Sequence, residues 1–125
     1  MKISRLQDLK VYQAELGFQQ RIFEISKTFP AEERYSLTDQ IRRSSRSIGA
    51  NTAEAWHKRR YEASFVHKLT DCSGENAETQ HWVETARLCN YIDDDTAAAL
   101  IAESEAIGRM LGSMIRDASK WCQPS

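Results

Sequence analysis

Apolar residues recur every three to four positions along almost the whole chain, and the alternation typical of strands is absent. The pattern predicts four helices, at about residues 8–28, 37–57, 61–90 and 95–119. Pro30 is predicted to end the first helix, because the residue before a proline avoids the helical region. In the third and fourth helices the apolar positions are alternately four and three residues apart, which is typical of helices that pack side by side.

Each predicted helix has one stripe of core candidates. These are Val11, Phe18, Ile22, Ile25 and Phe29 in the first helix, Leu37, Ile41, Ser44, Ile48, Thr52 and Ala55 in the second, Phe65, Leu69, Cys72, Asn76, Thr79, Val83 and Ala86 in the third, and Leu100, Ser104, Ile107, Leu111, Met114 and Ala118 in the fourth. Ser36 is the predicted N-cap of the second helix. Short connections between the four helices predict an all-α, up-down-up-down antiparallel four-helix bundle, a single domain over residues 1–125.

Length and composition narrow the class of protein further. A chain of 125 residues can build one domain with a hydrophobic core. No apolar run approaches the roughly 18 residues of a membrane span, and Met1–Arg5 lead directly into a charged amphipathic segment. We therefore expect a cytoplasmic protein that does not bind membranes. Cys72, Cys89 and Cys122 form no CxxC pair, so free thiols are expected in place of disulfides or a zinc site.

The small net charge of −1 hides an uneven distribution. Residues 1–60 hold 12 Lys and Arg against 7 Asp and Glu, whereas residues 61–125 hold 5 against 11. If the basic half of one subunit met the acidic half of the next, the contact would be head-to-tail. Contacts of that kind close into rings when the rotation between subunits permits it.

Basic residues concentrate in the second predicted helix and at the turn that follows it. Between positions 41 and 60 the chain has six basic residues and a single acidic one, Glu54. The candidate binding residues are Arg42, Arg43 and Arg46 on the helix and Lys58, Arg59 and Arg60 at the turn. Trp56 and Tyr61 lie near them in sequence, and a basic face with aromatic neighbours is typical of proteins that bind the RNA backbone and exposed bases.

A structural role for the same arginines is the alternative interpretation. On an antiparallel hairpin, Arg42 and Arg43 come to about the height of Glu75 and Glu78 on the third helix, where ion pairs can form. The mildly acidic chain is also less typical of a dedicated nucleic-acid-binding protein, which is usually basic.

Two E-x-x-H sequences, Glu54–His57 and Glu78–His81, match the pattern of carboxylate-bridged di-metal sites in helical bundles. With a turn near Arg59, however, Glu54 and Glu78 lie at heights that differ by about 20 Å along the hairpin. One chain cannot bring both to the same metal. The sequence also has no phosphate-binding loop and no nucleophile elbow, so we expect no metal, no cofactor and no enzymatic activity.

Several segments together resemble one known family, the four-helix-bundle proteins encoded in intervening sequences of 23S ribosomal RNA genes. The resemblance covers about residues 8–118 and rests on LTDQIRR at Leu37–Arg43 and SIGANTAEA at Ser47–Ala55, supported by Asp8–Gln13, Phe29–Tyr35, Phe65–Leu69, Glu78–Trp82 and Ile107–Leu111. Many members have Pro where this chain has Gly49, and Gly where it has Ala55.

The resemblance implies a four-helix bundle that assembles into a homopentameric ring. It also implies similarity in fold to the accessory variability determinant of diversity-generating retroelements, which binds a reverse transcriptase and nucleic acid through a basic surface. On this pattern Asn51 and Glu54 share a helix face and are expected to make a polar contact to the third helix or to a neighbouring subunit. Asn76 and Glu78 are the other predicted structural polar residues, and Asn76 should find a hydrogen-bond partner if it is buried.

Two functions remain open from the sequence. One is a non-enzymatic, homo-oligomeric binding module that associates with nucleic acid (RNA) or a ribonucleoprotein through the six basic residues, with DNA or a nucleic-acid-processing protein as other candidate partners. The other is a structural or adaptor ring that binds an acidic protein and no nucleic acid.

Overall fold

The computed structural model of the protein describes residues 3–122. Its four long helices are α1 (Lys10–Ser26), α2 (Leu37–His57), α3 (Glu62–Leu88) and α4 (Asp94–Arg116). The shorter elements are the 3-10 turns η1 (Leu6–Asp8) and η2 (Ala31–Glu33) and the helix α5 (Ala118–Trp121). No strand occurs between residues 3 and 122, so the prediction of an all-helical fold is confirmed.

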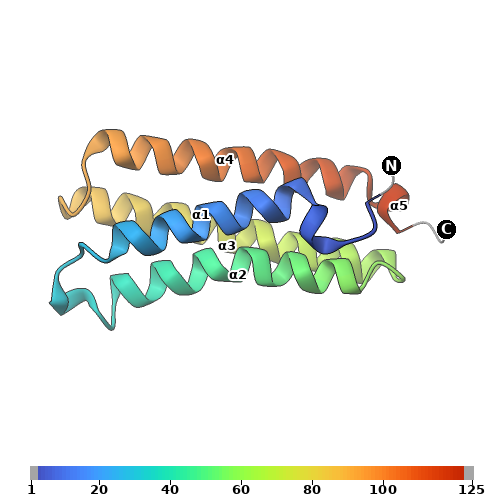
Figure 1. Cartoon of the computed structure of the whole chain (residues 1–125), viewed down its shortest axis with the longest axis horizontal. Helices are drawn as coiled ribbons and strands as arrows, with labels where there is room; N and C mark the ends of the chain where they lie inside the picture. The colour runs from blue at the N-terminus through green and yellow to red at the C-terminus, as the bar shows by residue number, and fades with distance from the viewer. Residues whose placement is uncertain (1–2, 123–125) are drawn as a thin grey trace.

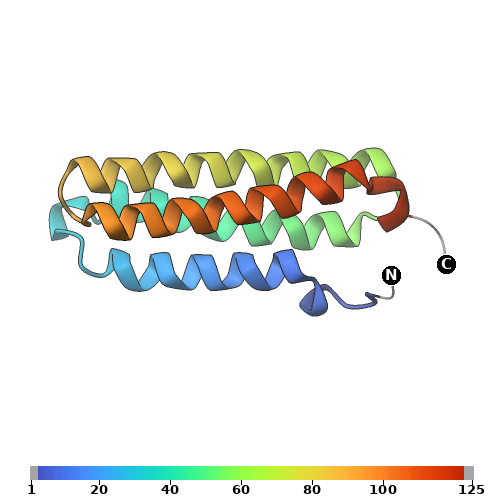
Figure 2. The same cartoon turned by 90° about the horizontal axis from the view of Figure 1, so that it is seen from above.

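Successive long helices run in opposite directions and are joined by short connections (Figure 1, Figure 2). Each packs against two others: α1 against α2 and α4, and α3 against α2 and α4. The interface between α2 and α3 is the most extensive of the four, and that between α1 and α4 is the least. The turn from α2 to α3 lies at the same end of the bundle as the two termini, and the other two connections lie at the opposite end (Figure 1). None of the helices within residues 3–122 has both the length and the apolar character needed to cross a membrane.

The predicted stripes form the core. Every predicted core position of α2 and α3 is buried, as are the predicted positions of the fourth helix from Leu100 to Ala118. In the first stripe Phe18 and Ile22 are fully buried, whereas Ile25 is only half-buried. Burial of each large apolar side chain contributes about 1.5–3 kcal/mol, which is what holds the four helices together.

Polar residues inside the core are paired between helices. The Asn76 amide on α3 donates to the Ser104 carbonyl at 3.0 Å, and the Ser104 hydroxyl on α4 donates to Asn76 Oδ1 at 2.7 Å. The Thr79 hydroxyl donates to Ser44 Oγ on α2 at 2.9 Å. Because these partners face one another at only one relative height, they fix the register of α3 against both neighbours.

The ends of the helices differ from the prediction in two respects. The fourth predicted helix is not continuous to residue 119, because α4 ends at Arg116 and α5 begins after Asp117. Ser36 occupies the predicted N-cap position of α2, but its side chain makes no capping hydrogen bond. Glu33 takes the role instead, since its Oε1 accepts from the Leu37 N–H at 3.2 Å.

Candidate nucleic-acid interface

Arg42 and Arg43 are neighbours in α2, but they face different helices. Arg43 points to α3, where its guanidinium hydrogen-bonds to Glu78 and lies 3.6 Å from Glu75. Glu78 also accepts a 3.0 Å hydrogen bond from Trp82 Nε1, and Trp82 and Arg43 together lower the pKa of Glu78. The same contact raises the pKa of Arg43. Arg43 therefore has the ion pairs that the structural interpretation requires.

Arg42 and Arg46 instead gather with Lys27 around one aromatic ring of α1. Their charged groups lie 4.8, 5.4 and 4.7 Å, respectively, from the centre of the Phe23 ring. Arg42 Nε also donates to Ser26 Oγ at 2.8 Å. Contacts of a cation with an aromatic face contribute about 0.5–1 kcal/mol at exposed sites, which partly offsets the repulsion between three like charges. We call Lys27, Arg42 and Arg46 the Phe23 cluster.

A groove of about 480 Å³ adjoins the Phe23 cluster. It is lined by Arg34, Tyr35, Thr38, Asp39, Arg42, Arg43 and Arg46, from the segment before α2 and the first half of α2. Tyr35 is 82% exposed, and the Arg34 guanidinium lies 5.3 Å from the centre of its ring. We call this concavity the Tyr35 groove. Its lining combines four cations, one carboxylate and one exposed aromatic ring.

The second group of predicted cations, Lys58, Arg59 and Arg60, lies at the turn from α2 to α3, and we call it the turn cluster. Arg59 covers Trp56 at 3.5 Å from the ring centre and donates from Nε to the Trp56 carbonyl at 3.0 Å. Arg60 lies 5.9 Å from the centre of the Tyr61 ring, which is 62% exposed. The helix rise places this cluster about 18 Å from the Phe23 cluster along α2.

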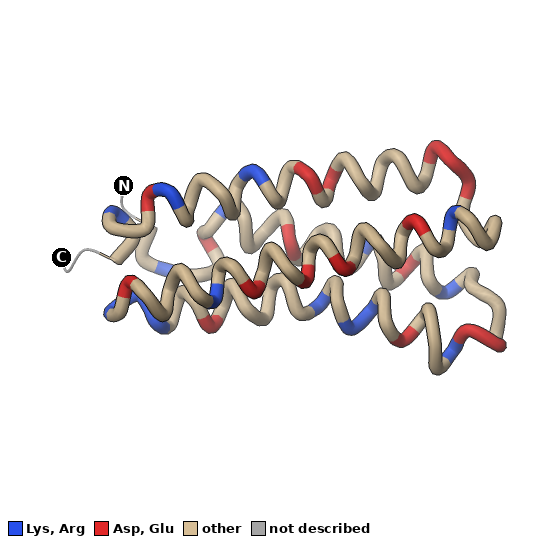
Figure 3. Tube along the Cα trace, turned by 180° about the vertical axis from the view of Figure 1, so that it is seen from behind, with Lys and Arg blue, Asp and Glu red and all other residues tan. Residues whose placement is uncertain are grey.

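Most of the predicted cations have no partner of opposite charge. Within residues 3–122, no carboxylate lies at ion-pairing distance from Arg42, Arg46, Lys58, Arg59 or Arg60. Figure 3 shows the cations of α2 as blue segments in its first half and at the turn into α3. Of the six predicted residues, the structure therefore ties only Arg43 to carboxylates.

The predicted structural polar residues lie in three different environments. Asn51 bonds within its own helix, to the Ser47 carbonyl at 2.9 Å, and does not make the expected contact to α3. Glu54 does reach α3, where Lys68 Nζ lies 2.9 Å from its Oε1 and lowers its pKa. Asn76 is buried against Ser104, as described above.

The two E-x-x-H glutamates are thus held by different cations at different heights along the hairpin, Glu54 by Lys68 and Glu78 by Arg43. In the described part of the chain, no three His, Cys, Asp or Glu side chains are grouped so that they could hold a metal ion. Burial raises the pKa of the Cys72 thiol to about 12, so this cysteine remains protonated and is a poor nucleophile.

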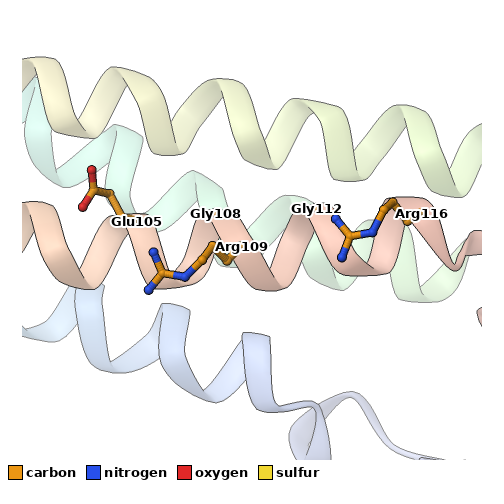
Figure 4. A pocket seen from close by; sticks show the side chains of 5 residues that line it. All are labelled: Glu105, Gly108, Arg109, Gly112 and Arg116. Carbon is orange, nitrogen blue, oxygen red and sulfur yellow. The ribbon is translucent and has the colours of Figure 1, made fainter.

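A second concavity, of about 670 Å³, lies on α4, diagonally across the bundle from α2. It is lined by Glu105, Gly108, Arg109, Gly112 and Arg116 (Figure 4). A Cβ on Gly108 would lie 3.5 Å from Asn76 Nδ2, an ordinary van der Waals contact, so the packing of α4 on α3 leaves room for a methyl group here. No aromatic side chain lines this concavity, and in this respect it differs from the Tyr35 groove.

Comparison with known proteins places this geometry in a family. The sequence profile of the 23S rRNA-intervening sequence proteins matches residues 7–113. The chain belongs to this family. A solved structure from the S23 ribosomal protein family, a protein of unknown function from Bacteroides thetaiotaomicron, is 32% identical; the match covers 84% of this chain and 97% of that one with a TM-score of 0.76. A search of curated proteins finds no match. The family expected from the sequence motifs is therefore confirmed.

In this member of the 23S rRNA-intervening sequence proteins, sequence reasoning missed four residues of the candidate interface: Phe23, Lys27, Arg34 and Tyr35. Phe23 on α1 and Lys27, the C-cap residue of that helix, are one turn apart on the same face. Their relation to Arg42 and Arg46 depends on how α1 packs against α2, which no local pattern reveals. Arg34 and Tyr35 lie in a short connection between two helices. An arginine next to a tyrosine in such a connection was the signal in the sequence that could have revealed them.

Proposed function

We propose that this protein is a non-enzymatic, homo-oligomeric module that binds RNA through α2 and the turn that follows it. The observation that carries the proposal is that Arg42, Arg46 and the turn cluster have no carboxylate partner within residues 3–122. Arginines and lysines without a carboxylate partner can bind the phosphates of a nucleic acid. The counterions that these phosphates had held are then released, and their release drives binding.

The aromatic residues favour a nucleic acid over a simple acidic surface. Both groups of cations have aromatic rings within reach, Tyr35 beside one and Tyr61 beside the other, and both rings are largely exposed. Exposed bases stack on such rings, whereas an acidic protein makes little use of them. The phosphate contacts would set affinity and position, without reading the sequence of the RNA.

Assembly into a ring, with a pentamer as the size expected from the family resemblance, is part of the same proposal. It is supported by the separation of charge along the bundle. The turn cluster lies at one end, whereas Asp93, Asp94 and Asp95 lie at the other, at the start of α4 (Figure 3). Complementary patches at different places on one subunit favour head-to-tail contacts.

The test is RNA binding by fluorescence anisotropy at low and moderate salt, with the oligomer size measured by light scattering. Arg42→Ala combined with Arg46→Ala should lower the affinity about ten-fold or more, and charge reversal of the turn cluster should abolish binding. The matched control is Arg21→Ala with Arg87→Ala, which removes the same charge from residues that are paired with Glu103 and Glu84. Equal losses in both double variants, or no RNA retained by the unmodified protein at low salt, would contradict the proposal.

The second candidate, an adaptor ring that binds an acidic protein or its own neighbour, is favoured by the same separation of charge. Lys58→Glu, Arg59→Glu and Arg60→Glu together discriminate between the two. If they dissociate the oligomer while the unmodified protein binds no RNA, the adaptor function is correct. If the unmodified protein binds RNA and the triple variant does not, the RNA-binding function is correct, and the mass of the variant then tells whether the turn cluster also contacts the neighbouring subunit.

A further inference from the structure

Tyr35 is the most exposed large apolar side chain of the described residues, with 82% of its surface accessible. It stands at the edge of the Tyr35 groove, directly before α2, and its ring has the Arg34 guanidinium 5.3 Å from its centre. An aromatic ring in this position adds nothing to the core. The Arg34 guanidinium lies over one face of the ring, which leaves the other face available to a planar group from a ligand.

The cations deeper in the groove are held in place before any ligand arrives. Arg42 is fixed by its Nε bond to Ser26 and by its contact with Phe23, and Arg46 rests against the same ring. The Nη atoms of Arg42 have no hydrogen-bond partner within residues 3–122. A side chain that is already ordered loses little entropy on binding, so these two arginines are suited to hold a phosphate.

We propose that the Tyr35 groove binds single-stranded RNA, with one base stacked on Tyr35 and the adjoining phosphates on Arg42 and Arg46. This inference rests on the proposed function and makes it more specific. A base can reach the Tyr35 ring only if it is free of its own stack, as in a single strand, a loop or a bulge. A duplex can contact the arginines but cannot use the tyrosine.

Asp39 also argues for a nucleotide and against a purely anionic ligand. It is the one carboxylate that lines the groove, and its charge acts on Arg43 next to it. A carboxylate repels an acidic peptide, but it can accept a hydrogen bond from a base amino group or a ribose 2′-hydroxyl. A nucleotide presents such donors beside its phosphate, which matches the mixed lining of the groove.

The test compares three probes: a short fluorescent single-stranded RNA, the same sequence as a duplex, and AMP as a competitor. Tyr35→Ala should weaken single-strand binding by about 5- to 160-fold, the range of one lost base-stacking contact, and change duplex binding less than about two-fold. Tyr35→Phe keeps the ring and should retain the affinity. Because the side chain is exposed, both variants should melt as the unmodified protein does, which circular dichroism checks.

The outcomes separate this inference from the proposed function. If Tyr35→Ala binds the single strand as well as the unmodified protein does, while Arg42→Ala with Arg46→Ala does not, the stacking site is disproved and RNA binding stands. The stacking site is also disproved if Tyr35→Ala weakens duplex binding as much as single-strand binding. Displacement by AMP at the concentration at which the oligonucleotide itself competes would identify a free nucleotide as the ligand and overturn the inference. If no RNA probe binds, both proposals fail.

Discussion

The hydroxyl of Thr52 on α2 donates a 2.8 Å hydrogen bond to Oε2 of Glu15 on α1, in the centre of the bundle, where both side chains are buried. Oε1 of the same carboxyl group has no partner among the described residues. Burial raises the pKa of Glu15 from its ordinary value of 4.5 to about 8, although the bond from Thr52 acts in the opposite direction. In the folded protein Glu15 is therefore mostly protonated at neutral pH.

Stability should consequently fall as the pH rises. A carboxyl group with a pKa near 4.5 in the unfolded chain and about 8 in the folded one holds its proton more tightly when folded. Its contribution to the free energy of unfolding is complete below the lower value and is lost as the pH rises through the upper value. Glu15→Gln keeps the size of the side chain but cannot ionise. We expect this variant to be more stable than the unmodified protein by a few kcal/mol above pH 8, with the difference vanishing below the unfolded-state value of 4.5.

Urea denaturation followed by circular dichroism over this pH range measures the difference directly. Subtracting the curve of Glu15→Gln from that of the unmodified protein removes the contribution of all other titrating groups, which the two proteins share. Parallel curves would mean that Glu15 is ionised in the folded state and would disprove the prediction.

A second prediction concerns Asn76, whose amide is paired with Ser104 across the α3–α4 interface. Asn76→Ala should lower the free energy of unfolding by about 1–3 kcal/mol, because the buried Ser104 hydroxyl loses its acceptor. Asn51→Ala is the matched control, since its side chain bonds only within α2 and its loss should change stability by less than about 0.5 kcal/mol. Urea midpoints compare the two variants. If both variants lowered the free energy of unfolding equally, the hydrogen bonds between Asn76 and Ser104 would add no more stability than a bond within one helix.

The sequence was sufficient for the fold because the core positions recur at a fixed helical spacing. The stripe from Phe65 to Ala86 is buried along its full length, Asn76 and Thr79 included. Glu15 escaped detection although it lies in register between Val11 and Phe18. A charged residue normally marks the solvent side of a helix. The burial of Glu15 is tolerable because the folded protein keeps its carboxyl group protonated and because Thr52 on another helix donates to it, and neither feature is visible in the local sequence.

The candidate interface was only partly predictable, because its contacts also join residues on different helices. Runs such as Lys58–Arg60 are visible in the sequence, but whether each cation is paired depends on which neighbour its side chain reaches. Arg42 and Arg43 differ by about 100° around α2, which is enough to direct one to α1 and the other to α3. The spacing along the sequence predicted carboxylate partners for both arginines. The packing of the helices gives such partners to Arg43 and directs Arg42 to α1.

Those two arginines give a third prediction, that adjacent substitutions have separable effects. Arg43→Ala removes exposed ion pairs with Glu75 and Glu78, so it should cost about 0.2–1 kcal/mol of stability and change RNA affinity little. Arg42→Ala should lower RNA affinity several-fold more than Arg43→Ala does. Anisotropy titrations and urea denaturation on the same preparations give both quantities. Greater loss of RNA binding in Arg43→Ala would mean that ion pairing does not decide which arginines contact phosphate.

The last prediction uses Gly74, which lies in the middle of α3 with open space around its Cα. A Cβ at this position would meet no atom within 4 Å apart from its chain neighbours and the backbone of its own helix. Glycine is about 0.5–1 kcal/mol less favourable than alanine inside a helix, because it loses more backbone freedom on folding. Gly74→Ala should therefore raise the free energy of unfolding by about that amount, as measured by urea denaturation. Light scattering on the same variant adds a check on the assembly, because a neighbouring subunit packed closely on this face of α3 would be displaced by the added methyl group. A loss of stability with no change in mass would contradict the open environment that the structure shows at this glycine.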